Sequence, residues 1–275
     1  MVEEEYLYDV TAALDILPRS FYPAPIGDPY IANLPAACTR VLDVASSSEK
    51  FSIAAVSLLP PLANPSKIIA APINFQSHID FDLLGSDIAH SHKISHITEA
   101  GLFLKATSSL AGVGNGFVIQ FPARRNDFEL ELVVVIGTQC HDVEESRALE
   151  VVAGYSIGLD MTVRGPEDRS FRKSHDGYSI VGPFLVTADE VECPDSLDML
   201  LTINGEIRQS ANTKDMVCGV RRLISMASKA YTLYPSDMIF CGTPDGVGEV
   251  VEGDHLACSI SKLGALSIAV KSKPA

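Results

Sequence analysis

The sequence contains few basic residues, and this scarcity excludes several classes of binding partner. Lysines and arginines number 21 against 35 aspartates and glutamates, which gives the 275-residue chain a formal net charge of −14. Proteins bind nucleic acids and anionic membrane surfaces mainly through clustered lysine and arginine side chains. We therefore expect neither a nucleic acid nor a membrane as a partner.

Closely spaced cysteines and long apolar runs are also missing. The six cysteines (38, 140, 193, 218, 241 and 258) are scattered, and no two of them form a C-x-x-C pair. This pattern is typical of reduced thiols in a cytoplasmic protein rather than of a disulfide framework or a zinc site. No apolar run approaches transmembrane length, and the N-terminal Met-Val-Glu-Glu-Glu is acidic where a signal peptide would be basic. These features predict a cytoplasmic protein.

Two glycine-rich segments lack the features of nucleotide-binding loops. The Gly-x-Gly-x-Gly segment at 112–116 has neither the preceding strand nor the third-glycine spacing of a dinucleotide loop. The segment 242–248 lacks the Gly-Lys-Ser/Thr of a phosphate loop. We assign no nucleotide cofactor to either. The second segment is instead predicted to be a rigid turn that presents Thr243 and backbone N–H groups.

The apolar residues that are present suffice for a sizeable core. Hydrophobic residues make up 47% of the chain, which at this length favours one large domain plus a smaller module. We predict that residues 1–68 form a small N-terminal α+β accessory module, because prolines at 60, 61 and 65 mark a turn that follows it. Residues 69–275 would then form the catalytic domain.

Several segments give signals for regular structure. Asp142-x-x-Glu145 resembles a capping box and predicts a helix over residues 143–152. Asn204-Gly205 between alternating runs predicts a β-hairpin, and a helix-period apolar stripe covers residues 217–231. The predicted strands are 6–10, 67–72, 155–164, 181–187 and 238–241, and the segment 51–59 is either a strand or a buried helix.

A stretch of acidic and apolar residues at 127–137 carries the strongest signal for a binding site. Its second half, 132–136, is an apolar β-branched run before a glycine, which predicts a buried strand. Asp127, Glu129 and Glu131 have spacing two, so their side chains would share one face of the strand. A hard divalent cation would keep such carboxylates ionised side by side. An edge strand with a solvated acidic face is the alternative.

Histidines gather in the segment 78–96. His78 is close in sequence to Asp80 and Asp82, and a carboxylate beside it would form a proton-transfer pair. A surface histidine in a loop is the alternative. The pattern His-x-His-x-x-x-His at 90–96 suggests a metal site, but its serine, lysine and aspartate neighbours favour a loop.

Basic residues stand out near the acidic strand and Asp160. Lys105 lies in an apolar run, where a lysine either pairs with an anion or extends to the surface. Arg164 ends the strand that carries Asp160. An island of basic residues beside carboxylates suggests a site for an anionic ligand bridged to a metal, with charge balancing between loops as the alternative. The loop after Arg164 holds this island, which comprises Arg169, Arg172, Lys173 and His175.

From residue 60 to the end, the chain resembles the fumarylacetoacetate hydrolase family, in particular its smaller bacterial-type members labelled hydratase, isomerase or decarboxylase. Seven motifs in the family's order carry the resemblance. They are Asn74-Phe75-x-x-His78, Phe103-Leu-Lys105, Glu129-Leu-Glu131-Leu-Val-Val-Val-Ile-Gly137, Gly154-Tyr…Leu-Asp160-Met-Thr-Val-Arg164, Lys173-Ser…Gly182-Pro183, Asn204-Gly-Glu…Gln209…Asn212-Thr213 and Gly242-Thr-Pro-Asp-Gly-Val-Gly248.

The resemblance implies both a fold and a metal site. The fold would be mainly β with short helices, a mixed β-sandwich roll joined to the N-terminal module, and the protein would be a homodimer. The metal would be Mg²⁺ or Mn²⁺, with Ca²⁺ as a further option. Its ligands would be the two glutamates of the Glu-x-Glu strand and the aspartate of the next strand, which are Glu129, Glu131 and Asp160.

The resemblance also implies roles for residues around the metal. Lys173 matches the family lysine that contacts the substrate. Thr243, which follows Gly242, matches the threonine that helps to hold the substrate carboxylate. Lys105 and Arg164 are expected to help Lys173 balance the negative charge of the substrate.

The predicted lid departs from the family pattern. His78 matches the lid histidine and would handle a proton or activate a water. The family carries a glutamate three residues later, where this chain has Phe81, so Asp80 or Asp82 is left as the replacement carboxylate. Positions 175 and 177 also differ, since the family more often has an aromatic residue and a threonine there.

These residues predict a divalent-metal-dependent hydrolase that cleaves a C–C bond. Its substrate would be a small anionic 2-oxo or 1,3-dicarbonyl carboxylic acid, and the reaction would pass through a metal-bound enolate. Decarboxylation or keto–enol isomerisation of a 2-oxo diacid, of the oxaloacetate or 2-hydroxymuconate type, is the alternative. A catalytically silent member that retains the fold is a third interpretation.

Overall fold

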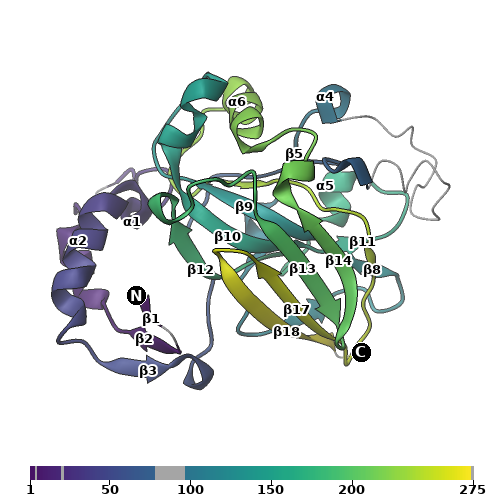
Figure 1. Ribbon diagram of the computed structural model, residues 1–275, viewed down its shortest axis with the longest axis horizontal. Helices are drawn as coiled ribbons and strands as arrows, with labels where there is room; N and C mark the ends of the chain where they lie inside the picture. Colours follow the sequence, from purple (N-terminus) through teal and green to yellow (C-terminus); the bar gives the residue numbers. More distant parts are fainter. Residues whose placement is uncertain (4, 20–21, 78–96, 274–275) are drawn as a thin grey trace.

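The computed structural model describes residues 1–3, 5–19, 22–77 and 97–273, and it is built around two β-sheets (Figure 1). The larger sheet has seven strands in the order β5-β4-β15-β9-β10-β12-β6. These strands are β5 (Phe103–Lys105), β4 (Ile68–Ala70), β15 (Met238–Phe240), β9 (Leu130–Ile136), β10 (Val152–Asp160), β12 (Ser179–Thr187) and β6 (Leu110–Ala111). The central strand β9 is buried along its whole length, as its apolar run predicts.

A five-stranded sheet packs against the first. Its order is β14-β13-β17-β18-β7, with bounds Glu206–Asn212, Asp198–Ile203, His255–Ile260, Gly264–Ser272 and Phe117–Ile119. A three-stranded sheet joins β11 (Thr162–Val163), β8 (Asn126–Phe128) and β16 (Gly248–Glu249). Buried residues of the two larger sheets and of helix α6 (Val220–Ala230) form one core. The predicted fold class, mainly β with short helices, is confirmed.

The other helical segments of residues 97–273 are short. They are α4 (Ile97–Ala100), α5 (Arg169–Arg172) and the 3₁₀ turns Thr107–Ser109, Glu145–Val151, Ala188–Glu190 and Thr213–Asp215. The helix predicted over 143–152 is therefore a 3₁₀ turn, and it starts late because Asp142 has a φ of +51° and makes no helical cap. The hairpin prediction is confirmed, since Asn204 and Gly205 have φ values of +53° and +87° between β13 and β14.

The N-terminal residues form a separate group of elements beside the larger sheet (Figure 1). A small sheet joins β1 (Val2–Glu3), β2 (Tyr6–Tyr8) and β3 (Lys50–Ser52), and the helical segments are Thr11–Ile16, α1 (Pro29–Ala32), α2 (Leu34–Ala45) and Ile53–Ala55. The prediction for 51–59 is wrong, because this segment holds the end of β3 and a 3₁₀ turn and is largely exposed. Helix α2 was not predicted, although its buried residues 34, 37, 41 and 45 have helical spacing.

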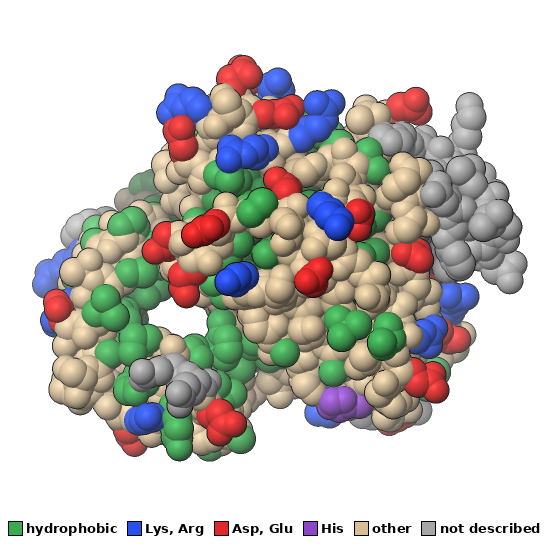
Figure 2. Space-filling model, in the orientation of Figure 1, with side chains coloured by type: hydrophobic (Ala, Val, Ile, Leu, Met, Phe, Trp, Pro, Cys, Tyr) green, Lys and Arg blue, Asp and Glu red, His purple; other side chains and the backbone are tan. Residues whose placement is uncertain are grey.

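The two faces of β9 pack against different parts of the molecule. Leu132 and Val134 belong to the core shared with the second sheet, whereas Val133 and Val135 pack with Ile31 and other N-terminal residues. Apolar side chains also gather around the opening between the N-terminal elements and the rest of the molecule (Figure 2). Within the described residues, no helix combines the length and the apolar character needed to cross a membrane.

Candidate metal centre

The candidate site begins where the acidic strand is interrupted. Strand β8 ends at Phe128 and β9 starts at Leu130, so Glu129 lies at a break between two sheets. The backbone N–H of Leu130 donates to Oε1 of Gln209 at 3.0 Å, and the Glu129 carbonyl accepts from the Asp160 N–H at 2.9 Å. These contacts hold Glu129 beside Asp160 at the end of β10.

Three carboxylates meet at this break. Glu129, Glu131 and Asp160 each offer a ligand atom, and these atoms lie within 4.8 Å of one another. Asp160 is the last residue of β10, which pairs antiparallel with β9 and places Gly158 opposite Glu131. The three side chains have exposed fractions of 6%, 1% and 1%, so water screens them little. We call Glu129, Glu131 and Asp160 the acidic triad.

Two buried lysines contact the acidic triad. Lys173 Nζ donates to Glu129 Oε2 at 2.6 Å and to Asp160 Oδ2 at 2.8 Å. Lys105 Nζ pairs with the other oxygen of Asp160, and burial lowers the pKa of this lysine. The sequence left open whether Lys105 pairs with an anion or extends to the surface, and the structure shows the ion pair. Both lysines therefore place their amino groups against the carboxylates of the site.

Among the described residues, Glu131 is held by a backbone N–H of the Gly242 loop and forms no ion pair. Its Oε2 accepts from the Gly242 N–H at 2.6 Å. Burial, together with the nearby charge of Asp160, raises the pKa of Glu131 well above its ordinary value. The negative charge of this side chain is costly in the protein alone, and a divalent cation would offset that cost. Three buried carboxylates are also the hard oxygen donors that Mg²⁺ and Mn²⁺ prefer, so the residues fit such an ion.

Asp127 does not belong to the cluster, although the spacing-two pattern predicts that it would. It is fully buried, and Arg125 Nε and Arg164 Nε donate to its two oxygens at 2.7 and 2.6 Å. Arg164 also reaches Glu129 Oε1 at 3.1 Å. The prediction fails for Asp127 because the break at Glu129 places it in the small sheet with β11 and β16. Arg164 thus joins this carboxylate to the acidic triad.

The Gly242 loop is fixed by two buried amides that the sequence analysis did not assign to the site. Gln209 Nε2 donates to Thr243 Oγ1 at 2.8 Å and to the Pro244 carbonyl at 3.0 Å. Asn74 Nδ2 donates to the Cys241 carbonyl at 2.7 Å. A Cβ on Gly242, whose φ is +95°, would lie 2.7 Å from the Asn74 Cβ, so this position requires glycine. The signal in the sequence was that both amides belong to motifs that carry the family resemblance.

Comparison with known proteins identifies the family. Residues 67–271 match the family model described as the C-terminal domain of fumarylacetoacetate (FAA) hydrolase. The chain belongs to this family. The family prediction made from seven motifs is thereby confirmed.

Two relatives match the chain over different shares of its length. The chain is 48% identical to maleylpyruvate hydrolase of Aquipseudomonas alcaligenes over 274 residues, which cover 99% of this chain and 96% of the relative. It is 39% identical to 2,4-didehydro-3-deoxy-L-rhamnonate hydrolase of a Sphingomonas strain, over 74% of this chain and 73% of that protein.

A solved structure has the same fold over the whole chain. It is the maleylpyruvate hydrolase of Sphingobium sp. SYK-6 in complex with manganese(II) and pyruvate. The TM-score is 0.84 at 33% identity, and the match covers 100% of this chain and 96% of the other. A 5-carboxymethyl-2-hydroxymuconate delta-isomerase from Mycobacterium smegmatis matches with a TM-score of 0.69 at 28% identity, over 82% and 86% of the two chains.

The predicted lid pair and the histidine pattern lie outside the described residues. His78 and Asp80, the predicted lid pair, both fall in the segment 78–96. Phe81, Asp82 and the histidine pattern at 90–96 fall there as well. Their roles stay predictions.

Gln209 gives a first testable prediction for this family member. Gln209→Leu removes the acceptor for the Leu130 N–H and the donor to Thr243, and each buried group left unpaired costs about 1–3 kcal/mol. We expect a lower midpoint of urea unfolding and a kcat/KM reduced by about 10- to 100-fold, as for other residues that orient ligands. Ser210→Ala, on the exposed neighbour in β14, is the control. A Gln209→Leu protein with normal kinetics would show that Thr243 needs no such support.

His175 lies in a cluster of aromatic rings near Lys173. Its ring centroid lies 4.7 Å from that of Phe121, 5.0 Å from Phe171 and 5.3 Å from Tyr178. Its Nε2 is buried and has no hydrogen-bond partner among the described residues. Burial, with a smaller effect of Arg124, lowers the pKa of His175 from its ordinary value of 6.5. The family's aromatic preference at this position therefore agrees with an apolar environment.

This environment predicts how stability depends on pH. Because the folded pKa of His175 is lowered, the unfolded chain binds a proton more readily, and stability falls as the pH drops through 6.5 and below. We expect His175→Phe to raise the melting temperature at pH 7.5. We also expect the melting temperature of the variant to fall less than that of the wild type between pH 7.5 and pH 5. Thermal unfolding at the two pH values checks this. Equal losses in the two proteins would assign the acid sensitivity to other groups.

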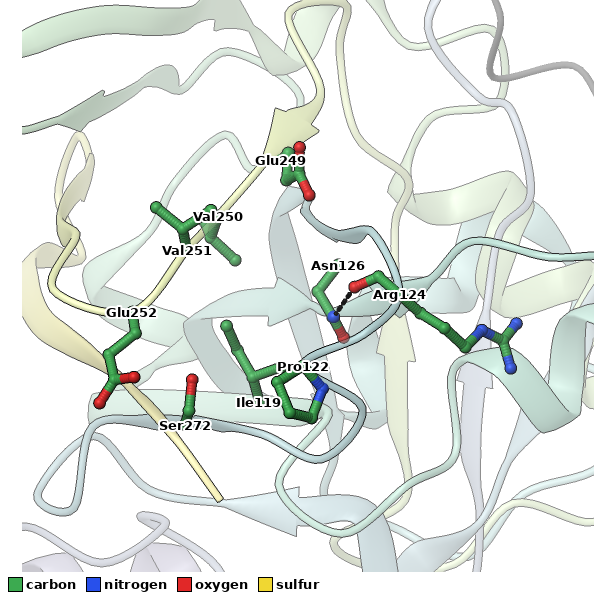
Figure 3. A pocket seen from close by; sticks show the side chains of 9 residues that line it. All are labelled: Ile119, Pro122, Arg124, Asn126, Glu249, Val250, Val251, Glu252 and Ser272. Atoms are coloured by element: carbon green, nitrogen blue, oxygen red, sulfur yellow. Dashed lines mark hydrogen bonds between the residues drawn. The ribbon is translucent and has the colours of Figure 1, made fainter. Parts of the chain in front are cut away.

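A small cavity lies apart from the acidic triad. It has a volume of about 220 Å³ and includes none of the triad residues. Its lining residues are Ile119, Pro122, Arg124, Asn126, Glu249, Val250, Val251, Glu252 and Ser272. Figure 3 shows that Arg124 extends away from the other side chains, while Asn126 Nδ2 donates to its carbonyl at 2.6 Å. We assign no chemistry to this cavity.

Proposed function

We propose that the protein is a divalent-metal-dependent hydrolase that cleaves a C–C bond in a small 2-oxo acid of the maleylpyruvate type. The observation that carries the proposal is the acidic triad, whose buried ligand atoms lie within 4.8 Å of one another. The 48% identity to a maleylpyruvate hydrolase over 99% of the chain supports the substrate class. The Sphingobium maleylpyruvate hydrolase, which forms a complex with manganese(II) and pyruvate, supports both the metal and the 2-oxo acid.

The acidic triad would hold Mn²⁺ or Mg²⁺. When bound, the ion would supply a Lewis acid for the oxygens of a 2-oxo acid. Lys173 and Lys105 would stabilise negative charge that develops on the substrate, since both are buried and their amino groups contact the acidic triad. Arg164 would add to this charge and hold Glu129. Thr243, positioned by Gln209 and preceded by Gly242, would bind the substrate carboxylate.

The proposed reaction breaks the bond between the acyl carbon and the methylene of the pyruvyl group. The hydroxyl of a water joins the acyl carbon, and a proton joins the methylene, so the products are a carboxylic acid and pyruvate. His78, with Asp80 as its carboxylate, would take the proton from the attacking water. Water activation is the step for which a histidine near neutral pKa is suited.

An assay with three substrate classes tests the proposal. We expect turnover of maleylpyruvate and related acylpyruvates with Mn²⁺ or Mg²⁺, its loss with a chelator and its return when metal is added back. Turnover of oxaloacetate alone would favour the decarboxylase alternative. Isomerisation of a 2-hydroxymuconate-type diacid without cleavage would favour the isomerase function named for several structural neighbours.

The organisation of the protein is part of the proposal. Residues 1–68 would brace the larger sheet as an accessory module, and residues 69–275 would carry the chemistry. We further propose a cytoplasmic homodimer. Light scattering of the purified protein would test the oligomeric state, because a monomeric mass contradicts it.

A further inference from the structure

Helix α5 is fastened to the strand that carries Lys105. The Ser170 hydroxyl donates to the Leu104 carbonyl at 2.7 Å, and the Ala106 N–H donates to Ser174 Oγ at 2.9 Å. Asp168 caps the helix by accepting from the Ser170 N–H at 2.8 Å. Both ends of this short helix are therefore fixed, and the side chains it carries have defined positions beside the site.

Around the acidic triad, the described residues include four buried carboxylates and four basic side chains. The carboxylates are Asp127, Glu129, Glu131 and Asp160. The cations that pair with them are Lys105, Arg125, Arg164 and Lys173. Among the described residues, a further cation near the triad therefore adds to the positive charge of these four side chains, and a bound divalent ion would add more.

Arg172, the last residue of α5, is such a further cation. It is half-buried, and its Nε donates to the Glu167 carbonyl at 2.9 Å. The Glu167 carboxylate is taken by Arg124, whose two terminal nitrogens lie 2.9 and 2.7 Å from its oxygens. Over the described ranges of the chain, no carboxylate forms an ion pair with Arg172.

The surroundings of Arg172 connect it to the acidic triad. Burial lowers the pKa of this guanidinium, the charge of Arg164 lowers it further, and the charge of Glu129 opposes both effects. The next residue in the chain, Lys173, reaches Glu129 directly. Arg172 is therefore a partly desolvated cation beside the site, and its planar fork matches the geometry of a carboxylate.

We propose that Arg172 binds the second carboxylate of a dicarboxylic substrate, at the end remote from the pyruvyl group. This inference rests on the proposed function, and it narrows the substrate class to acylpyruvates that carry a carboxylate on the acyl part. The alternative is a purely structural role, in which Arg172 only anchors α5 through its hydrogen bond to the Glu167 carbonyl. In that case its loss would affect all substrates equally.

The test compares two substrates that differ in this carboxylate. Maleylpyruvate carries it and acetylpyruvate lacks it. For Arg172→Met we expect the ratio of kcat/KM, maleylpyruvate over acetylpyruvate, to fall by about 10- to 100-fold, as for the loss of a charge-assisted hydrogen bond. Arg172→Lys keeps the charge without the fork and should give an intermediate ratio. Arg147→Met is the control, since Arg147 is an exposed arginine that pairs with Glu150 in the 3₁₀ turn Glu145–Val151.

Binding of the dicarboxylic product separates this inference from the proposed function. In calorimetry with Mn²⁺ present, maleate should bind the Arg172→Met protein at least about 10-fold more weakly than the wild type. An unchanged ratio of kcat/KM, or equal maleate affinity, would overturn the role of Arg172. If the wild type hydrolyses neither acylpyruvate, the proposed function fails, and the maleate titration still decides whether Arg172 recognises a carboxylate.

Discussion

Glu131→Gln should abolish metal binding and metal-dependent activity while the fold persists. Glu131 is 1% exposed, and burial beside Asp160 already raises its pKa well above the ordinary value. A neutral amide of the same shape removes one of three crowded negative charges, so the metal-free protein should melt at the same temperature or higher. A metal site that loses one of three carboxylate ligands forfeits several kcal/mol, and kcat/KM should fall by at least about 10³-fold.

Two measurements check the Glu131 prediction. Calorimetric titration with Mn²⁺ should give heat for the wild type and none for the variant. The melting temperature of the wild type should rise with Mn²⁺, since an ion that binds only the folded state stabilises it, and that rise should vanish in the variant. Glu150→Gln, at an exposed glutamate that pairs with Arg147, serves as the control. Persisting Mn²⁺ stabilisation in Glu131→Gln would show that the ion binds elsewhere.

Lys173→Met should have the second-largest effect, with a different signature. Lys173 is 6% exposed and donates to Glu129, Asp160 and Thr162 at 2.6, 2.8 and 2.7 Å. Removing one partner of a buried ion pair costs about 3–5 kcal/mol, so the metal-free variant should unfold at a lower urea concentration. Added Mn²⁺ should restore much of this stability, because it supplies positive charge to the same carboxylates.

Activity should not recover with stability in this variant. If the Lys173 ammonium stabilises charge on the substrate, kcat/KM should fall by about 10²- to 10³-fold even at saturating Mn²⁺. Steady-state kinetics and urea unfolding on the same preparations make the comparison. Lys214→Met, at an exposed lysine, is the matched control. Near-normal turnover by Lys173→Met in the presence of Mn²⁺ would show that Lys173 only neutralises the buried carboxylates and takes no part in catalysis.

The buried strand β9 could be predicted from the sequence because its signal is local. Leu132 to Ile136 are apolar, and they form an entirely buried strand. The hairpin at Asn204-Gly205 was readable for the same reason, since both residues accept a positive φ. By contrast, the capping box at Asp142 failed because its backbone conformation follows tertiary contacts, including the Asp142 N–H to the Ser228 carbonyl at 2.9 Å.

The composition of the candidate site was only partly readable. Spacing along the chain predicted that Asp127 would join Glu129 and Glu131, and this was wrong because the strand is interrupted at Glu129. The interruption depends on Gln209, which lies 79 residues from Leu130 in sequence. Asp160 was proposed through the family resemblance, since no local pattern reveals which strand will pair with β9.

Pairing between cations and carboxylates was hidden from the sequence as well. The basic island correctly indicated that positive side chains approach the acidic ones, as Lys173 shows. It did not indicate which arginines are already neutralised. Arg164 pairs with Asp127 and Glu129, whereas Arg124 pairs with Glu167, and these partners are 37, 35 and 43 residues apart. Side-chain pairing over such separations is decided by the folded backbone alone.

The double-sided burial of β9 limits how the protein can be shortened. Val133 and Val135 share a buried apolar cluster with Ile31, Leu34 and Leu62, which all precede the first residue matched by the family model. A fragment starting at residue 67 would retain every member of the acidic triad. It would also expose the apolar face of β9 that carries Val133 and Val135 to solvent. We expect such a truncation to aggregate. Residues 1–66 would then be needed for a folded enzyme, because they cover this apolar face.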